Sequence, residues 1–480
     1  MPLILPGNVA SATAAAYSVD NSCMFNGADT YLSRTTSSAT PTLTTKATLS
    51  FWIKTLSPTN QYITYTNGGT SPYFYMQFPD SNGKLVILDY IGGGSSTDIV
   101  GTFVLRDPSA WMHVVYSYDS TPSTPSSSSI KIFINGVQTT ALTGGSAYAA
   151  QNTATKLTAA SVAHPIGVHA NTSAQFLNAY LAEYMVVDGQ ALNADSFGEF
   201  DSDSPTIWKP IDISGITVGN QGYYLDFKDS SNLGNDVGGN DFDFTSNNID
   251  ATNQATDTPT NNFCTVNPLD NYFAASTFSE GNCKIVTNSS NYSFNTGTFG
   301  LTAGKWYFEA KCATSAGSDK NVIGISAVPS DATTNYLGED AYMWSYYGQA
   351  GNSVTGGTSS SYGDSYTTND IVGVAIDLDN NKLYFAKNNI WQDSGDPTSG
   401  ATGTGALSIT AVTSTTSGVY FPAMGDFSSD SSTTWEVNFG NPVAALTSAA
   451  NDANGYGNFE YAPPSGYLAI CTKNLGSDGG

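Results

Sequence analysis

The chain of 480 residues is long enough for two or three domains of ordinary size. Hydrophobic residues make up 40% of it and aromatic residues 12%, with only 12% charged residues, and this composition excludes a largely disordered chain. The formal charge of −24 disfavours nucleic acid and anionic lipid as partners. No apolar run approaches the roughly 20 residues that span a bilayer, so no membrane insertion is expected.

The first 21 residues, 1–21, are small and apolar without periodicity and contain no Lys or Arg, which predicts an arm and not a secretory signal. Such an arm would dock onto a neighbouring subunit, where contacts would order it. The five cysteines are odd in number and widely spaced, with no CxxC pair: Cys23, Cys264, Cys283, Cys312 and Cys471. We expect buried free thiols in a protein that is assembled in a reducing cytoplasm.

Strand patterns dominate residues 22–201. Alternating apolar and polar residues predict strands at 48–54, 73–78, 84–91, 111–118, 130–135 and 176–188. The run SIKIFINGVQ (129–138) breaks at Asn135 and Gly136, a pair that supplies the positive φ angles of a two-residue hairpin. Short strands at this spacing predict an antiparallel β-sandwich.

A connector is expected at residues 202–265, which are rich in Gly, Asn, Asp and Pro and contain one short strand candidate, GYYLDFK (222–228). We expect it to be ordered and to pack on its neighbours through its aromatic residues: Trp208, Tyr223, Tyr224 and Phe227. Asp241 and Asp243, in DFDF, offer carboxylate oxygens to a calcium ion. Calcium is the only cofactor considered, and otherwise none is expected.

A second sandwich is predicted at residues 266–441, with strands at 305–312, 321–328, 341–347, 371–379, 382–387, 418–426 and 433–440. The run NKLYFAKNNIWQ (381–392) repeats the hairpin pattern, with Asn388 and Asn389 in the turn. The C-terminal segment 442–480 includes the only helix candidate, the Ala-rich run 442–454, which a loop explains equally well.

Two resemblances explain the repeated hairpin. The runs SCMFNGADTYLSRT (22–35), SFWIK (50–54) and AYLAEYMVVDGQAL (179–192) resemble the laminin-G/concanavalin-A-like jelly roll, in which the last segment returns beside the first and closes the sheet. The runs FGLTAGKWYFEAKC (299–312), DIVGVAIDLDNNKLYFAKNNIW (370–391) and TTWEVNFG (433–440) resemble a SPRY domain, also a two-sheet sandwich. The resemblances imply an all-β chain: two tandem antiparallel concanavalin-A-like β-sandwiches, or jelly rolls, with an ordered connector and extended terminal arms.

Segments outside the sandwiches, YLDFKDSSNLGNDVGGNDF (224–242) and NFEYAPPSGYLAICTKNL (458–475), resemble parts of virion proteins of tailed phages, especially marine ones. This resemblance implies a non-enzymatic virion structural protein, a tail fibre, head fibre or receptor-binding component. It would present lectin-like domains to host-surface glycans and contact other virion proteins. We expect a homo-oligomer, for instance a trimer, assembled in the host cytoplasm and exposed on the exterior of the virion.

Three alternatives remain at this point. The sandwiches could serve only protein–protein contacts in a virion or capsid-decoration protein, and a cellular surface adhesin is disfavoured because no export signal is recognised. A polysaccharide depolymerase needs two carboxylates about 5 Å apart, commonly from a Glu-x-Asp-x-Glu strand. The nearest glutamates, Glu183 and Glu199, are 16 residues apart, so no catalytic residue is assigned. The three histidines lack metal-ligand spacing and are interpreted as structural: His113, His164 and His169.

The run AYMWSYYGQAGNSVTGGTSSSYGDSY (341–366) holds the highest local concentration of aromatic and neutral polar residues. Sandwich loops carry recognition while the sheets hold them in place. Trp344 and Tyr346 alternate on one strand face and belong either to the core or to the site, whereas the other tyrosines are predicted to lie at the surface. The predicted glycan- or partner-binding residues are Trp344, Tyr346, Tyr347, Tyr362, Asp364 and Tyr366.

Overall fold

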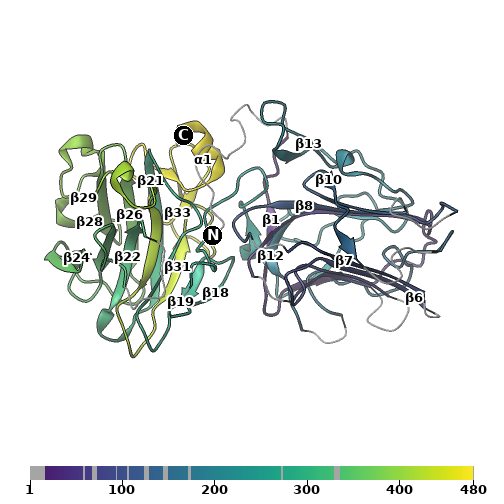
Figure 1. Ribbon diagram of the computed structural model, residues 1–480, viewed down its shortest axis with the longest axis horizontal. Coiled ribbons are helices and arrows are strands. Elements are labelled where there is room, and N and C mark those ends of the chain that lie inside the picture. The colour runs from purple at the N-terminus through teal and green to yellow at the C-terminus, as the bar shows by residue number, and fades with distance from the viewer. Residues whose placement is uncertain are drawn as a thin grey trace. The chain divides into compact units, whose positions relative to one another are not determined.

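The computed structural model describes residues 17–57, 60–66, 73–92, 95–104, 107–123, 129–143, 150–170, 174–271, 274–328 and 336–478. The described residues form two compact units, an N-terminal unit up to residue 260 and a C-terminal unit from residue 261 (Figure 1). Most of the predicted connector, residues 202–260, therefore belongs to the N-terminal unit. The predicted arm, residues 1–21, lies outside the described residues except for its last five.

Two facing sheets form the N-terminal unit. The strand order of the larger sheet is β10-β9-β8-β3-β12-β1-β17, with β15 also beside β12. Its strands are β1 (Ser22–Asn26), β3 (Lys46–Thr55), β8 (Met112–Asp119), β9 (Ile130–Ile134), β10 (Val137–Gln138), β12 (Asn178–Asp188), β15 (Tyr223–Leu225) and β17 (Gln254–Ala255). The smaller sheet has the order β11-β7-β6-β5-β4, from β4 (Tyr62–Tyr65), β5 (Tyr73–Gln77), β6 (Val86–Gly92), β7 (Ser95–Gly101) and β11 (Leu142–Thr143).

The long strand β12 closes the larger sheet as the laminin-G resemblance implies. It returns antiparallel beside β1, with Cys23 opposite Leu181. Its second half pairs with β15, where Met185 lies opposite Tyr224. The connector thus adds a strand, and its residues Tyr223, Tyr224 and Phe227 are buried, as expected. Two short pairs complete the unit: β13 (Gly198–Phe200) with β14 (Trp208–Pro210), and β2 (Tyr31–Ser33) with β16 (Thr245–Asn247).

The C-terminal unit is a second two-sheet sandwich. One sheet has the order β18-β19-β31-β21-β26-β27-β28, and the other β20-β30-β22-β23-β24-β25. The first contains β18 (Thr277–Ser279), β19 (Lys284–Val286), β21 (Lys305–Thr314), β26 (Ile371–Asp377), β27 (Lys382–Lys387), β28 (Ile390–Trp391) and β31 (Thr434–Asn438), with β29 (Leu407–Ser408) and β34 (Leu468–Ala469) attached. The second contains β20 (Ser293–Thr296), β22 (Asn321–Ser326), β23 (Met343–Tyr347), β24 (Asn352–Thr355), β25 (Thr358–Ser361) and β30 (Phe421–Asp426).

Both predicted hairpins are confirmed. Asn135 and Gly136 have φ angles of 48° and 79° and join β9 to β10. Asn388 and Asn389 have φ angles of 48° and 68° and join β27 to β28. Two successive positive φ angles define the turn whose twist matches that of the paired strands. All five cysteines are buried and free, also as expected.

Of the two alternatives left open for residues 442–454, a helix or a loop, the structure shows no helix. Thr447 there donates its backbone N–H and its hydroxyl to the Glu460 carboxylate, which holds the segment against the following chain, and β32 (Ala450–Asn451) pairs with β33 (Asn458–Phe459). Among the described residues the α-helix is α1 (Thr472–Asp478). Short 3₁₀ turns lie at Ala194–Ser196, Ala251–Asn253, Gly317–Asp319, Gln392–Ser394, Pro397–Thr402 and Val412–Ser414. No described helix is long and apolar enough to cross a membrane.

Candidate functional site

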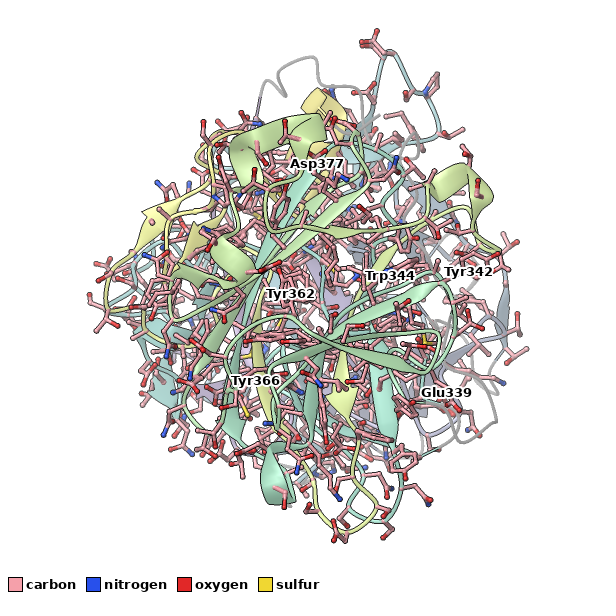
Figure 2. The ribbon with its side chains drawn as sticks, turned by 90° about the vertical axis from the view of Figure 1, so that its left-hand side faces the viewer. Glu339, Tyr342, Trp344, Tyr362, Tyr366 and Asp377 are labelled. Carbon is pink, nitrogen blue, oxygen red and sulfur yellow. The ribbon has the colours of Figure 1, made fainter. Side chains whose placement is uncertain are left out.

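Tyr362 and Tyr366 lie in the core of the C-terminal unit, and the prediction that they face solvent is wrong. Tyr366 is 1% exposed, and its hydroxyl lies within hydrogen-bonding distance of the carbonyls of Asn321 (3.0 Å) and Tyr346 (2.9 Å). Tyr362, labelled in Figure 2, is 7% exposed. Its ring centroid lies 5.9 Å from that of Phe385. The physical reason is that the loop 362–370 crosses from β25 in one sheet to β26 in the other, so its aromatic rings fill the gap between the sheets.

Trp344 and Tyr346 are also buried, which confirms the core interpretation for this pair. The indole of Trp344 packs edge-on against Tyr420 at 5.7 Å, and Tyr346 stacks on Phe385 at 5.4 Å. The hydroxyl of Tyr346 donates to the backbone carbonyl of Asp364. Burial removes both side chains from any surface that a ligand contacts, and Tyr346 instead holds the loop at Asp364.

Tyr347 and Asp364 are the two predicted residues that remain at the surface. Tyr347 is half-buried and donates its hydroxyl to Gln349 Oε1 at 2.7 Å. Asp364 is exposed, and its backbone N–H donates to Gln392 Oε1 at 2.7 Å. Within the described residues the Asp364 carboxylate accepts no hydrogen bond, so it is available to a partner.

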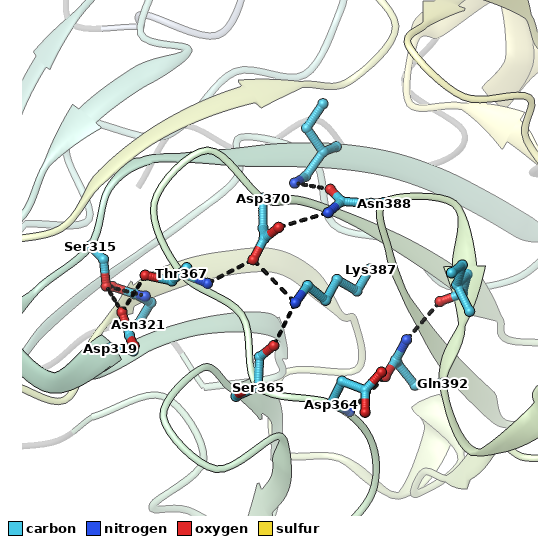
Figure 3. A network of polar contacts seen from close by, with 12 residues as sticks. Ser315, Asp319, Asn321, Asp364, Ser365, Thr367, Asp370, Lys387, Asn388 and Gln392 are labelled. Atoms are coloured by element: carbon cyan, nitrogen blue, oxygen red, sulfur yellow. Dashed lines mark hydrogen bonds and ion pairs between the residues drawn. The ribbon is translucent and has the colours of Figure 1, made fainter.

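A polar network fixes the loop 362–370 to its neighbours (Figure 3). Asp370 accepts from the backbone N–H of Thr367 at 2.9 Å and from Asn388 Nδ2 at 2.6 Å, and it pairs with Lys387 at 3.4 Å. Lys387 also donates to the carbonyl of Ser365 at 2.8 Å. Because the loop is tied to the β27–β28 hairpin in this way, its exposed groups are held in one arrangement before any partner binds.

A second aromatic cluster lies in the N-terminal unit, on the outer face of β4, β5 and β6. In β5 the side chains of Phe74 and Met76 point into the core, so those of Tyr73 and Tyr75 point outward. The register places Tyr90 opposite Tyr73 and Tyr65 opposite Tyr75. We call this surface the tyrosine face; it consists of Tyr62, Tyr65, Tyr73, Tyr75 and Tyr90.

The rings of the tyrosine face stand close together, and all but that of Tyr62, which meets Tyr75 edge-on at 5.4 Å, are nearly parallel. Centroids are 5.3 Å apart for Tyr73 and Tyr90, 5.6 Å for Tyr65 and Tyr75, and 5.7 Å for Tyr65 and Tyr73, with interplanar angles of 28°, 21° and 22°. His169 closes one side, with its ring centroid 4.7 Å from those of Tyr62 and Tyr65. The two tyrosines beside the histidine are therefore buried, while the other three are half-buried.

The hydroxyls of the tyrosine face are neutral, and they make no hydrogen bond to another described protein atom. Burial, together with the neighbouring phenols, raises the pKa values of Tyr62, Tyr65 and Tyr75 to about 12, so these groups stay protonated at physiological pH. In the described part of the chain none of the five hydroxyls donates to another protein atom, and none is a buried unpaired atom, so each reaches solvent. The tyrosine face thus offers aromatic edges and a row of free donors.

Comparison with known proteins identifies both units. Residues 26–196 match the model of the concanavalin A-like lectin/glucanases superfamily in its laminin-G form, and residues 305–426 match the SPRY domain model. A laminin-G-like domain precedes a SPRY domain. Both types are typical of binding modules: SPRY domains mediate protein–protein interactions, and the lectin-like sandwich indicates a protein- or carbohydrate-binding role.

Individual relatives match only part of the chain. Ran-binding protein 9 of Homo sapiens is 34% identical over 87 residues, which are 18% of this chain and 12% of that protein; the Danio rerio protein aligns with the same identity over 14% of its length. The chain thus spans a small part of these relatives. Among solved structures, the SPRY domain of human HERC1 is 14% identical over 36% of this chain and 96% of its own, with a TM-score of 0.29. The heptameric SAP-like pentraxin from Limulus polyphemus is 17% identical over 37% and 80%, with a TM-score of 0.26.

The SPRY domain has a cavity of about 310 Å³ lined by three glutamates, the arrangement that a hydrolase would need. Burial raises the pKa of Glu309 to about 7. Its carboxylate accepts the backbone N–H groups of Glu460 and Tyr461, each at 2.9 Å. The Glu460 carboxylate in turn accepts the backbone N–H of Thr447, and the Glu436 carboxylate pairs with Lys284 Nζ at 3.1 Å. The three carboxylates are thus held by protein donors, and Glu309 fastens the C-terminal segment onto β21.

The proposed calcium ligands do not gather into a site. Asp243 accepts from the backbone N–H of Asp236 at 2.9 Å and from Asn232 Nδ2 at 3.2 Å, so its carboxylate closes a turn of the connector, and Asp241 stands exposed nearby. Across the described residues no group of three or more His, Cys, Asp or Glu is placed to hold a metal ion. His113 and His164 are buried in the laminin-G-like unit, in keeping with a structural role.

Proposed function

We propose that the chain is a non-enzymatic virion structural protein, a tail- or head-fibre or receptor-binding component, whose laminin-G-like domain binds host-surface glycan. The observation that carries the glycan part is the tyrosine face, with its five solvent-reaching hydroxyls. The virion part is supported by the resemblance of residues 224–242 and 458–475 to tailed-phage proteins. Five buried free thiols suit assembly in the host cytoplasm, before exposure on the exterior of the particle.

The chemistry of the tyrosine face fits neutral glycan. Phenol rings are amphipathic, with an apolar body for the C–H surfaces of sugars and a hydroxyl for their oxygens. The negative charge of Asp98 contributes to the raised pKa of Tyr75, so a carboxylate lies close to the face. With a formal charge of −24 over the whole chain, anionic polysaccharide would be repelled. Neutral polysaccharide is therefore the expected ligand class.

The SPRY domain is assigned the contact with other virion proteins and with further copies of the chain. Its loop 362–370 is fixed by the Asp370 network, and the adjacent hairpin tip exposes Ile390 at 68%. A rigid loop with a free carboxylate at Asp364, beside a hairpin with an apolar tip, suits a protein partner, because little conformational entropy is lost on binding. A homo-oligomer, for instance a trimer, is part of this proposal, and light scattering of the purified protein measures it.

The test is an array of bacterial surface polysaccharides probed with the purified full-length protein. We expect saturable binding to a neutral polysaccharide that Tyr73→Ala and Tyr75→Ala each weaken about tenfold, which corresponds to about 1.4 kcal/mol. Tyr456→Ala, at an exposed tyrosine of the other unit, is the matched control. A folded oligomer that binds no polysaccharide would favour the purely structural alternative, a virion or capsid-decoration protein. Release of reducing sugar from a bound polysaccharide would favour a depolymerase, and antibody labelling of intact particles tests the virion location.

A further inference from the structure

A cavity of about 490 Å³ lies on the outer surface of the larger sheet of the laminin-G-like unit. Its floor is β9, where Ile130 and Ile132 point into the core and Lys131 and Phe133 therefore point outward. Its wall is the β13–β14 pair, which carries Trp208. We call it the Trp208 cavity. Its volume falls within the roughly 300–1,000 Å³ of typical small-molecule sites.

The indole of Trp208 is fixed in the wall of this cavity. Its Nε1–H donates to His113 Nδ1 at 3.1 Å, and His113 Nε2 bonds Ser50 Oγ at 2.9 Å. Burial lowers the pKa of His113 to about 3, so the imidazole stays neutral and continues to accept. Gly136 and Gly198 approach the ring so closely that an added Cβ would lie 2.2 Å and 2.6 Å from it.

A second aromatic ring stands beside the first. Phe200 is 43% exposed, and its ring meets that of Trp208 edge-on at 4.9 Å. Because the phenylalanine ring lies against a fixed indole, the two rings together offer one aromatic surface to a ligand. The two rings form one corner of the cavity.

Polar groups with unused hydrogen-bonding capacity line the same cavity. Lys131 donates to Asn193 Oδ1 at 3.2 Å, which orients that amide and leaves its NH₂ group free. As far as the chain is described, the Gln138 amide and the Asp195 carboxylate have no hydrogen-bond partner within the protein. Both are exposed. Donors and acceptors of both kinds therefore surround an aromatic corner.

We propose that the Trp208 cavity binds a single pyranose ring of a neutral sugar. A pyranose has an apolar C–H face that packs on an aromatic ring, and vicinal hydroxyls that side-chain amides such as Gln138 and Asn193 bond in pairs. Anionic ligands are disfavoured because two carboxylates, Asp195 and Glu199, line the cavity against a single cation, Lys131. The Trp208 cavity lies on the larger sheet, whereas the tyrosine face lies on the smaller sheet. Trp208 also lies beyond the residues that match the laminin-G model. The inference therefore goes beyond the proposed function and does not depend on it.

The test uses the full chain labelled with ¹⁵N-tryptophan and titrated with methyl α-glycosides of glucose, galactose, mannose and N-acetylglucosamine. We expect at least one glycoside to give saturable shifts of one indole N–H signal, the signal that Trp208→Phe removes. Phe200→Ala and Asn193→Ala should each weaken that binding about fivefold. Val137→Ala, at an exposed residue of β10 that does not line the cavity, should leave it unchanged.

Two outcomes overturn the proposal: no glycoside gives saturable shifts, or binding survives both Phe200→Ala and Asn193→Ala at full strength. If Trp208→Phe does not fold, the exposed Phe200 and Asn193 carry the test, because neither side chain supports the core. Tyr75→Ala separates the two sites. It should weaken polysaccharide binding at the tyrosine face about tenfold and leave the titration of the Trp208 cavity as it is in the wild type, so failure of one site is distinguishable from failure of the other.

Discussion

The two tyrosine clusters of this chain differ in burial and in the hydrogen bonds of their hydroxyls. In the SPRY domain, Tyr346, Tyr362 and Tyr366 are buried and their hydroxyls are bonded to other protein atoms. On the tyrosine face of the laminin-G-like domain, Tyr73 and Tyr75 stand half-buried with free hydroxyls. Both clusters arise from similar sequence, tyrosines among small polar and apolar residues. What separates them is the course of the backbone after the strand.

The loop 362–370 of the SPRY domain crosses from one sheet to the other, so its tyrosines fill the gap between the two sheets. On β5, by contrast, the inward positions are already occupied by Phe74 and Met76, and the tyrosines are left on the outer face. Alternation along a strand assigns residues to two faces, but it does not say which face another layer covers. The hydroxyls differ accordingly: those of Tyr362 and Tyr366 are bonded to backbone carbonyls, whereas those of Tyr73 and Tyr75 make no hydrogen bond to another described protein atom.

The largest expected effect is the loss in the free energy of unfolding when a buried tyrosine of the SPRY domain is removed. Tyr366→Ala removes a fully buried ring that packs 5.0 Å from Tyr346, and large-to-small changes of this kind cost about 3–5 kcal/mol. Urea unfolding of the SPRY unit in the full chain measures the loss. Tyr456→Ala, at a tyrosine that is 40% exposed, is the control and should stay within about 0.5 kcal/mol. Equal losses for the two variants would show that Tyr366 is not a core residue.

The next expected effect is a loss of polysaccharide binding with little loss in the free energy of unfolding. The double variant Tyr73→Ala/Tyr75→Ala leaves the core side of β5 intact, so we expect a loss of about 1 kcal/mol or less in the free energy of unfolding. Polysaccharide binding should nevertheless fall by more than the tenfold of either single variant. The rings of Tyr73 and Tyr75 stack 6.2 Å apart, so the two single losses are coupled and do not simply multiply. The array and the urea titration are run on the same preparation. A large loss of stability with unchanged binding would reverse the roles that we assign to the two clusters.

Much of the fold was predictable because the strands of both sandwiches are apolar, aromatic and β-branched runs bounded by turn residues, and both hairpins carry Asn in their turns. The tyrosine face was not, and β4 shows why. A bulge between Tyr62 and Thr64 places Ile63 and Thr64 both inward, so Tyr62 and Tyr65 reach the same outer face although they are three residues apart. Strict alternation puts those two residues on opposite faces, so no period-two pattern marks this strand.

The predicted site failed for a related reason. Residues 341–366 are adjacent in sequence, which made them the obvious cluster, but a loop that changes sheets turns sequence neighbours into core. The tyrosine face is assembled from three strands whose tyrosines are up to 28 residues apart, from Tyr62 to Tyr90. The Tyr-x-Tyr pair at Tyr73 and Tyr75 was the available signal, since a strand was predicted there. Its partners became visible only with the register.

A pH-dependent effect compares the two domains through one buried glutamate in each. Burial raises the pKa of Glu183 and of Glu309 from the ordinary 4.5 to about 7. The folded state therefore holds a proton more tightly than the unfolded state does. The stabilisation is complete below about pH 4.5 and is lost as the pH rises to about 7. We expect the urea midpoint of each domain to fall across this interval.

Single variants assign that fall to each domain. Glu183→Gln, which keeps an acceptor for the hydroxyls of Tyr17 and Tyr224, should flatten the pH dependence of the laminin-G-like domain alone. Glu309→Gln should do the same for the SPRY domain. Asp89 and Asp426, whose pKa values burial raises to about 6 and about 7, leave a residual slope in each domain. A slope that is steeper at neutral pH in the glutamine variants would contradict the assignment.

The smallest expected effect comes from removing a single hydroxyl group from each cluster, which compares a bonded hydroxyl with a free one directly. Tyr366→Phe deletes a hydroxyl that is bonded to a buried carbonyl, so the SPRY domain should lose about 1 kcal/mol. Tyr75→Phe deletes a hydroxyl with no intramolecular partner in the described structure, so the free energy of unfolding should not change, while polysaccharide binding weakens about threefold. Both are measured as for the alanine variants. If Tyr75→Phe destabilises the domain as much as Tyr366→Phe does, the hydroxyl of Tyr75 is already bonded within the protein. The tyrosine face would then be a second piece of core, and its assignment to glycan binding would lose its main support.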